Sequence, residues 1–129
     1  MRNWIDLLEQ LDHEEYEGQD EFIAKLRDPR ITQRYVRAIV RWRDDVIAKQ
    51  PSREYLDYNI ISNWPHRDAS QDAIEARLGL VDWEGIENDR ETAMEWALKI
   101  LNDAIAHPLD WDCICGAAMS YLLGKHPID

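Results

Sequence analysis

The chain has 129 residues, which suits one domain with its own hydrophobic core and is too short for two domains of comfortable size. Hydrophobic side chains make up 45% and charged side chains 32%, a composition that is typical of folded proteins and excludes wholesale disorder. Fifteen basic and 26 acidic side chains give a net charge of −11, so a polyanion could bind only at a strongly basic local patch.

The first half of the chain is predicted to form four helices. Trp4, Leu7, Leu8 and Leu11 recur at a helical spacing and mark the first helix. Prolines and cap residues set the bounds of the others. The expected helices are 4–15, a short one between Asp20 and Pro29, 32–49 ended by Pro51, and 52–64 capped by Ser52 and ended by Pro65.

The second half is predicted to form three more helices. Ser70 opens one that closes at Gly79, where a left-handed backbone is expected. Residues 81–88 resemble a loop or a single turn. Asn88 and Glu91 form a capping-box pattern for a helix that ends at His107.

Asp110 is expected to cap a last helix that ends near Gly124. No alternating strand pattern with turn residues is found in the sequence. We therefore predict an all-α protein, a compact bundle of about six or seven amphipathic helices, with residues 1–129 as one domain.

Charge is distributed unevenly along the chain. Residues 1–25 carry eight acidic and two basic side chains, whereas residues 26–53 carry three acidic and eight basic ones. Residues 82–112 carry nine acidic side chains and only two basic ones. The net charges of these segments are −6, +5 and −7. A basic helix is thus flanked along the chain by two acidic segments.

The basic helix carries an arginine stripe. At about 100° per residue, Arg30, Arg34, Arg37 and Arg41 fall within a narrow arc, opposite the apolar side chains. The stripe could bind phosphate or nucleic acid, or it could bind an acidic partner. It could also pair with carboxylates of the protein itself. The surplus of acid on both flanks favours internal pairing, and the sequence lacks the interleaved aromatic residues of nucleic-acid sites.

Tryptophan is abundant, with six residues in the chain. Trp83 and Trp111 have similar acidic neighbours, in Asp82-Trp83-Glu84 and Asp110-Trp111-Asp112. One interpretation is an acidic helix start whose aromatic residue packs back on the core. The other is an interface anchor with a carboxylate rim, suited to a basic partner.

Trp96 is predicted to project away from the apolar face of its helix. That face is expected to contain Ala93, Met94, Ala97, Leu98, Leu101, Ala104 and Ile105. Trp96 would lie instead among Thr92, Lys99 and Asp103, with Glu95 beside it. A large aromatic side chain in that position either packs under another segment or contacts a partner.

Cys113 and Cys115 are the two cysteines, and they are too close along the chain for a useful structural disulfide. They point apart on a helix, which favours packing over a zinc site with His107 or His126. Without a signal peptide or an apolar run of roughly 20 residues, we expect a cytoplasmic protein that does not enter a membrane.

Enzyme motifs are weak. A magnesium-dependent nucleotide hydrolase is an alternative because acidic side chains occur in pairs on helices, at Glu14-Glu15, Glu17, and Glu91 with Glu95. Their order does not match the Glu-Glu-x-x-Glu pattern of such enzymes. No nucleophile elbow or phosphate-binding glycine loop occurs, so we expect no cofactor, no metal and no catalytic residue.

The leading hypothesis from the sequence is an acidic helical protein-binding module. It would be an inhibitor or an antitoxin-like immunity protein that masks a basic surface of a partner protein, without binding nucleic acid directly. A structural subunit that forms homo-oligomers is a further alternative. The partner-binding candidates are Asp82, Trp83, Glu84, Glu95, Trp96, Asp103, Asp110, Trp111 and Asp112, and the candidate patch for an anion or acidic partner is Arg30, Arg34, Arg37 and Arg41.

Overall fold

The structure is a computed structural model that describes residues 27–65 and 68–128. Six α-helices and two 3-10 turns make up this part of the chain, which contains no strand. In chain order they are α3 (Pro29–Lys49), α4 (Arg53–Asn59), η1 (Ile61–Asn63), α5 (Asp68–Leu78), α6 (Trp83–Asn88), α7 (Arg90–Ala106), η2 (Pro108–Asp110) and α8 (Asp112–Leu122). The predicted all-α class is confirmed.

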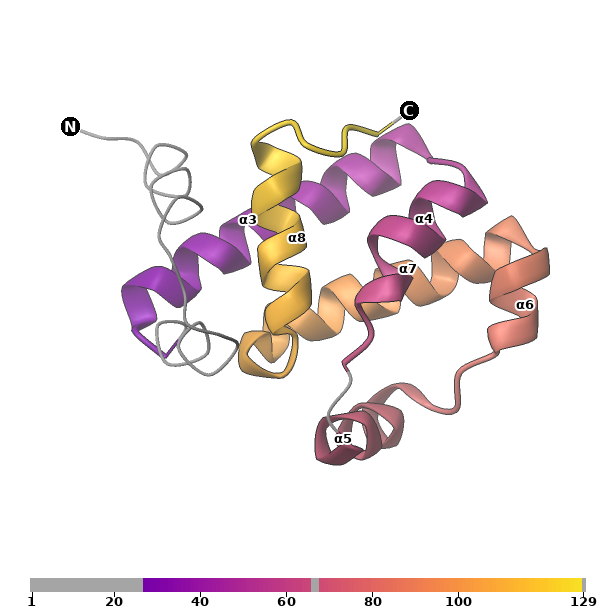
Figure 1. Cartoon of the computed structure of the whole chain (residues 1–129), viewed down its shortest axis with the longest axis horizontal. Helices are drawn as coiled ribbons and strands as arrows, with labels where there is room; N and C mark the ends of the chain where they lie inside the picture. The colour runs from indigo at the N-terminus through magenta and orange to yellow at the C-terminus, as the bar shows by residue number, and fades with distance from the viewer. Residues whose placement is uncertain (1–26, 66–67, 129) are drawn as a thin grey trace.

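Helices α3 and α7 are the two long elements of the fold. Helix α8 crosses α3 and packs on it, and α4 and α6 pack on the N-terminal half of α7 (Figure 1). Helix α5 lies apart from the α3–α8 layer, beyond the end of α4 (Figure 1). The predicted helix 4–15 lies outside the described residues, and so does the predicted helix between Asp20 and Pro29 apart from residues 27 and 28, which form a turn and a bend.

Several helix ends differ from the prediction. Helix α3 begins at Pro29, three residues earlier than expected, because the Asp28 side chain accepts a hydrogen bond from the Arg30 N–H and proline suits the first helical turn. Helix α4 is capped by Ser52 as predicted but ends at Asn59 and continues only as the short turn η1. Gly79 has the expected positive φ, 93°, directly after α5.

Two predicted caps in the second half are wrong. The cap of α7 is Asp89 rather than Asn88, because the Asp89 carboxylate accepts from the Glu91 N–H and from the Thr92 hydroxyl. Asp110 lies in η2, and α8 begins at Asp112, preceded by Trp111 as a cap residue that makes no side-chain cap hydrogen bond. Residues 83–88, expected as a loop or a turn, form the short helix α6.

The hydrophobic core is one cluster that draws on every helix described. Helix α3 contributes Tyr35, Ala38, Ile39, Trp42 and Val46. Four of these five, Tyr35, Ile39, Trp42 and Val46, lie on the side of the helix opposite the arginine stripe, where the sequence places apolar side chains. Among the described residues no polar or charged residue is fully buried, so the core is held by apolar burial and close packing.

The buried face of α7 is rotated from the predicted one. It contains Ala93, Trp96, Ala97, Ile100, Leu101 and Ala104, while Met94, Leu98 and Ile105 are only partly buried. Helix α7 lies between other elements and contacts α3, α4 and α6. A helix contacted from several sides buries a wider arc than one amphipathic face, which is why Trp96 lies inside.

None of the described helices is long and apolar enough to cross a membrane.

Trp42 is the residue whose loss should most damage this core. Its side chain is fully buried, and its indole N–H donates to the Tyr55 hydroxyl at 3.1 Å. Replacing Trp42 by Ala should lower the free energy of unfolding by about 3–5 kcal/mol, measured by urea denaturation. The control Tyr58→Ala removes an aromatic side chain that is 69% exposed and should change it by less than about 0.5 kcal/mol. Equal effects of the two changes would contradict this core.

Candidate functional site

One acidic surface stands out on the described part of the chain, and we call it the Trp83 surface. It consists of two exposed apolar side chains and five carboxylates on α6, on the start of α7 and directly before them. Its residues are Leu80, Asp82, Trp83, Glu84, Glu87, Asp89 and Glu91, all of them exposed. Leu80 is 84% and Trp83 51% exposed. An aromatic residue this exposed in a segment of exposed acidic residues is a candidate contact site.

The backbone of this surface is fixed by two caps. The Asp82 carboxylate accepts from the Gly85 N–H at 2.9 Å and so begins α6. Gly85 is needed there because a Cβ at this position would collide with the Asp82 carboxylate and the Thr92 methyl group. Asp89 begins α7 one residue after α6 ends. The two helices therefore join through a single residue that caps the second of them.

Helix α6 is held on the core from the other side. Ile86 is buried, and its carbonyl oxygen accepts from the Arg53 guanidinium of α4 at 3.3 Å. Arg90, the basic residue within this stretch, turns back and donates to the carbonyl oxygen of Pro51. Its charge is therefore directed at the α3–α4 connection and away from the acidic side chains.

None of the five carboxylates of the Trp83 surface forms an ion pair within residues 27–65 and 68–128. The Thr92 hydroxyl and the Glu91 N–H lower the pKa of Asp89 from its ordinary value. Five like charges lie within ten residues and reinforce one another's field. A positively charged surface would be drawn towards this end of α7.

Trp83 is positioned by a stack of indoles. Its ring meets that of Trp64 edge-to-face, with centroids 5.8 Å apart, and Trp64 meets Trp111 in the same way at 5.5 Å. Trp64 is nearly buried and Trp111 is fully buried. We call Trp83, Trp64 and Trp111 the tryptophan ladder. It runs from the surface into the core and limits the orientations that Trp83 can adopt.

The inner end of the ladder is held by a polar network. The Trp111 indole N–H donates to the Asp103 carboxylate at 2.8 Å. Arg77 of α5 donates to both oxygens of Asp103, at 3.0 and 2.8 Å, and reaches Asp110 at 3.0 Å. Burial opposes ionisation of Asp103, but the hydrogen bonds from Arg77 and Trp111 leave its pKa below the ordinary value. The network ties α5 to α7 and η2.

The predicted partner-binding residues are thus divided between surface and interior. Asp82, Trp83 and Glu84 come together on the Trp83 surface. Asp103, Asp110 and Trp111 also come together, but as an internal network. The Trp111 side chain is fully buried and offers no contact area to a partner. It therefore fits the interpretation of an aromatic residue that packs back on the core, and not that of an interface anchor. Asp112 is partly buried in the first turn of α8.

Trp96 is likewise inside, with only 5% of its surface exposed. The Lys99 ammonium lies over its ring, 4.3 Å from the ring centroid, and pairs with Glu95 at 3.5 Å. Trp96 therefore packs under other parts of the chain and is not exposed for contact with a partner. Glu95 is exposed, but its carboxylate forms an ion pair with Lys99. The tryptophan next to it, Trp96, is buried.

The arginine stripe of α3 does not bind the acidic segment 82–112. Arg30 pairs with Asp28 at 3.4 Å and Arg41 with Asp45 at 3.3 Å, both within or next to the same helix. Arg34 and Arg37 form no ion pair with the described residues. The acidic segment 1–25 lies outside the described residues, so internal pairing of the stripe with that segment stays a prediction.

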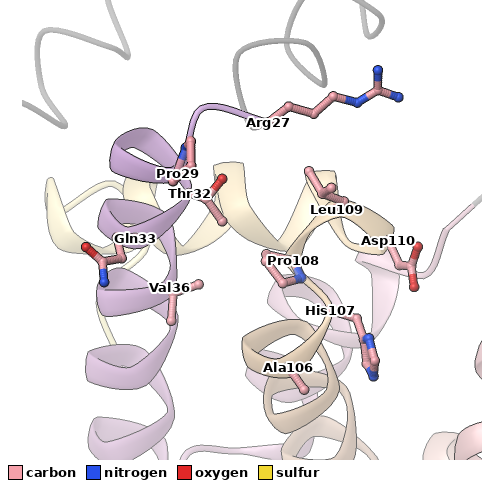
Figure 2. A pocket seen from close by; sticks show the side chains of 10 residues that line it. All are labelled: Arg27, Pro29, Thr32, Gln33, Val36, Ala106, His107, Pro108, Leu109 and Asp110. Carbon is pink, nitrogen blue, oxygen red and sulfur yellow. The ribbon is translucent and has the colours of Figure 1, made fainter.

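A groove of about 650 Å³ lies at the other end of α7, between the start of α3 and η2 (Figure 2). In Figure 2 the side chain of Val36 points across it towards Pro108, whereas the Arg27 guanidinium points away. The groove is lined by Arg27, Pro29, Thr32, Gln33, Val36, Ala106, His107, Pro108, Leu109 and Asp110. At 1.5 Å per residue, the 17 residues of α7 place its start, with Asp89 and Glu91, about 25 Å from the end at which the groove lies.

The described residues also bear on metal and cysteine chemistry. Histidine, cysteine and carboxylate side chains form no cluster of three or more there that could hold a metal ion. Cys115 is buried, which raises the pKa of its thiol to about 12 and keeps it protonated. Glu14, Glu15 and Glu17 of the hydrolase alternative lie outside the described residues.

Sequence reasoning missed four members of the Trp83 surface, namely Leu80, Glu87, Asp89 and Glu91. The sequence contains a signal for the two helix starts that form this surface, since Asp82 and Asp89 are residue types that favour the cap position and are followed by helix-compatible sequence. The interpretation of residues 81–88 as a loop hides this surface. Glu84 and Glu87 share a face only if the segment is helical, because they are three residues apart. The role of Trp64 in the ladder has no sequence signal, because it depends on tertiary packing.

Comparison of the chain with protein-family models, with curated proteins and with solved structures found no match. The site is therefore interpreted from its own residues.

Arg77 should be the most important charged residue beneath the tryptophan ladder, because it compensates the charge of Asp103, whose side chain is only 8% exposed. Arg77→Met should lower the free energy of unfolding by about 2 kcal/mol at pH 7, because it removes charged hydrogen bonds from a nearly buried carboxylate. The control Arg37→Met removes an arginine that has no described ion pair and should change little.

The effect of Arg77→Met should depend on pH. The pKa of Asp103 is lower in the folded chain than its ordinary value of 3.8. The stabilisation from ionised Asp103 is therefore complete above about pH 3.8 and is lost as the pH falls through the folded-state pKa. The difference between wild type and variant in urea denaturation should shrink below pH 3.8. A difference that stays constant down to pH 2.5 would show that Arg77 acts by packing alone.

Proposed function

We propose that this chain is a protein-binding module that recognises a basic surface of a partner protein through the Trp83 surface. The observation that carries the proposal is the half-exposed Trp83, which lies in a stretch of ten residues with five exposed carboxylates that lack an ion pair in the described part. The four other described tryptophans are buried. Trp83 is thus the one described indole with substantial area for a partner.

The geometry suits an anchor that is ordered before binding. Trp83 rests against Trp64 and begins α6, whose cap and buried Ile86 fix the backbone. A side chain that is already ordered loses little conformational entropy when it binds. Leu80 adds apolar area next to it along the chain. An apolar anchor with a charged rim is the common arrangement of binding hot spots in protein interfaces.

The charge of the surface supports a basic partner. Glu84 and Glu87 are not caps, so their carboxylates are free to face a partner. A negative field of this kind accelerates association with a positive surface and repels acidic ones. An inhibitor or immunity-type protein that masks a basic binding site would use these properties. This finer assignment rests on the charge and on the exposed anchor alone.

The first test concerns the anchor. Proteins captured on the immobilised chain from its source cell should be basic, and the purified partner should bind Trp83→Ala about 30-fold more weakly than wild type in calorimetry, since such anchors contribute about 2 kcal/mol or more. Leu109→Ala is a matched control because Leu109 is also an exposed apolar residue but lies at the groove. Unchanged affinity of a folded Trp83→Ala variant would refute the anchor.

The second test concerns the rim. Glu84→Gln with Glu87→Gln removes two charges without touching a cap, and should reduce the association rate constant by about fivefold at low salt. The dissociation rate should change little, and the difference should vanish near 0.5 M salt, where the field is screened. Stopped-flow measurements at several salt concentrations give both rate constants. An association rate that does not fall with rising salt in the wild type would contradict a basic partner.

A further inference from the structure

After α8, the C-terminal end of the described chain forms a turn and a bend and then an irregular segment. Helix α8 ends at Leu122, and Gly124, with a φ of 80°, turns the chain back. Figure 1 shows residues after α8 running from its end towards the C-terminal end of α3. Pro127 and Ile128 lie beside Arg41, Asp45 and Lys49 of α3, where together they line a small depression. We call residues 125–128 the C-terminal strap.

His126 inserts the strap into a box of three aromatic rings. Its imidazole lies 5.2 Å from Trp42 of α3, 6.5 Å from Tyr55 of α4 and 6.0 Å from Tyr121 of α8, measured between ring centroids. The Tyr55 hydroxyl donates to the His126 carbonyl oxygen at 2.9 Å, and this hydroxyl also accepts from the Trp42 indole. One histidine thus joins three helices.

Within the described residues, the box provides no hydrogen-bond acceptor for a proton on His126 Nε2. His126 Nε2 is buried and forms no hydrogen bond with the described residues. The nearest carboxylate on α3, Asp45, already accepts from the Tyr121 hydroxyl and from Arg41. Among the described residues, the other charged groups at the strap are the cations Arg41, Lys49 and Lys125, and the remaining titratable groups of the box are Tyr55 and Tyr121. A proton on His126 would add charge and a donor without an acceptor.

We propose that the C-terminal strap is a pH-sensitive closure, which is shut while the His126 imidazole is neutral and opens when that ring takes up a proton. Opening withdraws the imidazole from the box and exposes the Trp42 and Tyr55 rings to solvent between α3, α4 and α8. The core beneath them keeps its other contacts, since Trp42 also stacks on Tyr121 at 5.8 Å. The inference is independent of the Trp83 surface.

The direction of the effect follows from burial. Burial lowers the pKa of His126 in the folded chain below its ordinary value of 6.5. When the strap is open, the ring is in water and has its ordinary pKa. The closed state therefore has its full stability above about pH 6.5 and loses it as the pH falls through the lower pKa of the closed state.

The test uses the full chain and nuclear magnetic resonance between pH 8 and pH 4.5. The Cε1 proton of His126 should titrate with a midpoint below 6.5, and the indole N–H of Trp42 should shift with the same midpoint while circular dichroism shows unchanged helix content. In His126→Phe, which keeps an aromatic ring but cannot be protonated, the Trp42 signal should stay constant across this range. His107→Gln, which changes an exposed histidine, should behave like wild type.

Three results would overturn the proposal. One is a His126 midpoint at or above 6.5, which would mean that the aromatic rings stabilise the imidazolium. Another is a Trp42 signal that is unchanged while His126 titrates. The third is loss of helix with the same midpoint, which would make the transition global. If His126→Phe does not fold, Tyr55→Phe serves instead, because it removes the hydroxyl that holds the strap and should bring the midpoint closer to 6.5.

Discussion

The support beneath Trp83 ends in one part-buried hydrogen bond, which the Trp111 indole donates to Asp103. Trp111 is the innermost ring of the tryptophan ladder, and an indole N–H at full burial must find an acceptor. Asp103 provides it, and Arg77 compensates the charge of Asp103. Each member of the ladder thus rests on the one beneath it, and the lowest rests on an ion pair between α5 and α7.

This arrangement explains why a large aromatic side chain can remain exposed without disturbing the fold. Trp64 covers one edge of Trp83, so about half of the indole is buried by the protein itself. The remaining half is held at a fixed angle, and Ile86 on the same short helix fixes the backbone. Rigid exposure differs from a loosely attached aromatic residue, since binding to it costs less ordering entropy.

Fold class and most helices could be predicted from the sequence, because prolines and apolar spacing act locally. The cap of α7 was placed one residue early, at Asn88, because Asn and Asp are both good caps and only the backbone geometry selects Asp89. The apolar face of α7 was misplaced for a different reason. A single-face pattern cannot reveal that several elements contact a helix, and Trp96 is buried by that contact.

The site shows the limit of sequence reasoning more sharply. Trp83 and Trp111 have nearly the same acidic neighbours, yet one is half exposed and the other fully buried. What separates them is Arg77, which lies 26 residues from Asp103 and turns the acids around Trp111 into an internal network. Around Trp83 the basic neighbour Arg90 turns away. Such long-range pairing leaves no periodic trace in the sequence.

Helix capping accounts for part of the acidity of the Trp83 surface. Asp82 and Asp89 are caps, and Glu84 and Glu91 lie in first turns, where a carboxylate is favoured by the helix dipole. Capping and the helix dipole do not explain Glu87, because it lies in the last turn of α6, where negative charge is disfavoured. Its neighbouring charges repel it as well.

The apolar members of the surface are also unexplained by capping. Leu80 is almost fully exposed before α6 begins, and Trp83 follows the capping residue Asp82 at the first position of α6, where the cap does not require a large aromatic side chain. Each of these features costs stability or solubility when the chain is alone. Three such features, an unfavourable carboxylate and two exposed apolar side chains, coincide on one rigid surface. Contact with a basic partner would offset the cost of all three features. A purely structural role for these residues would not.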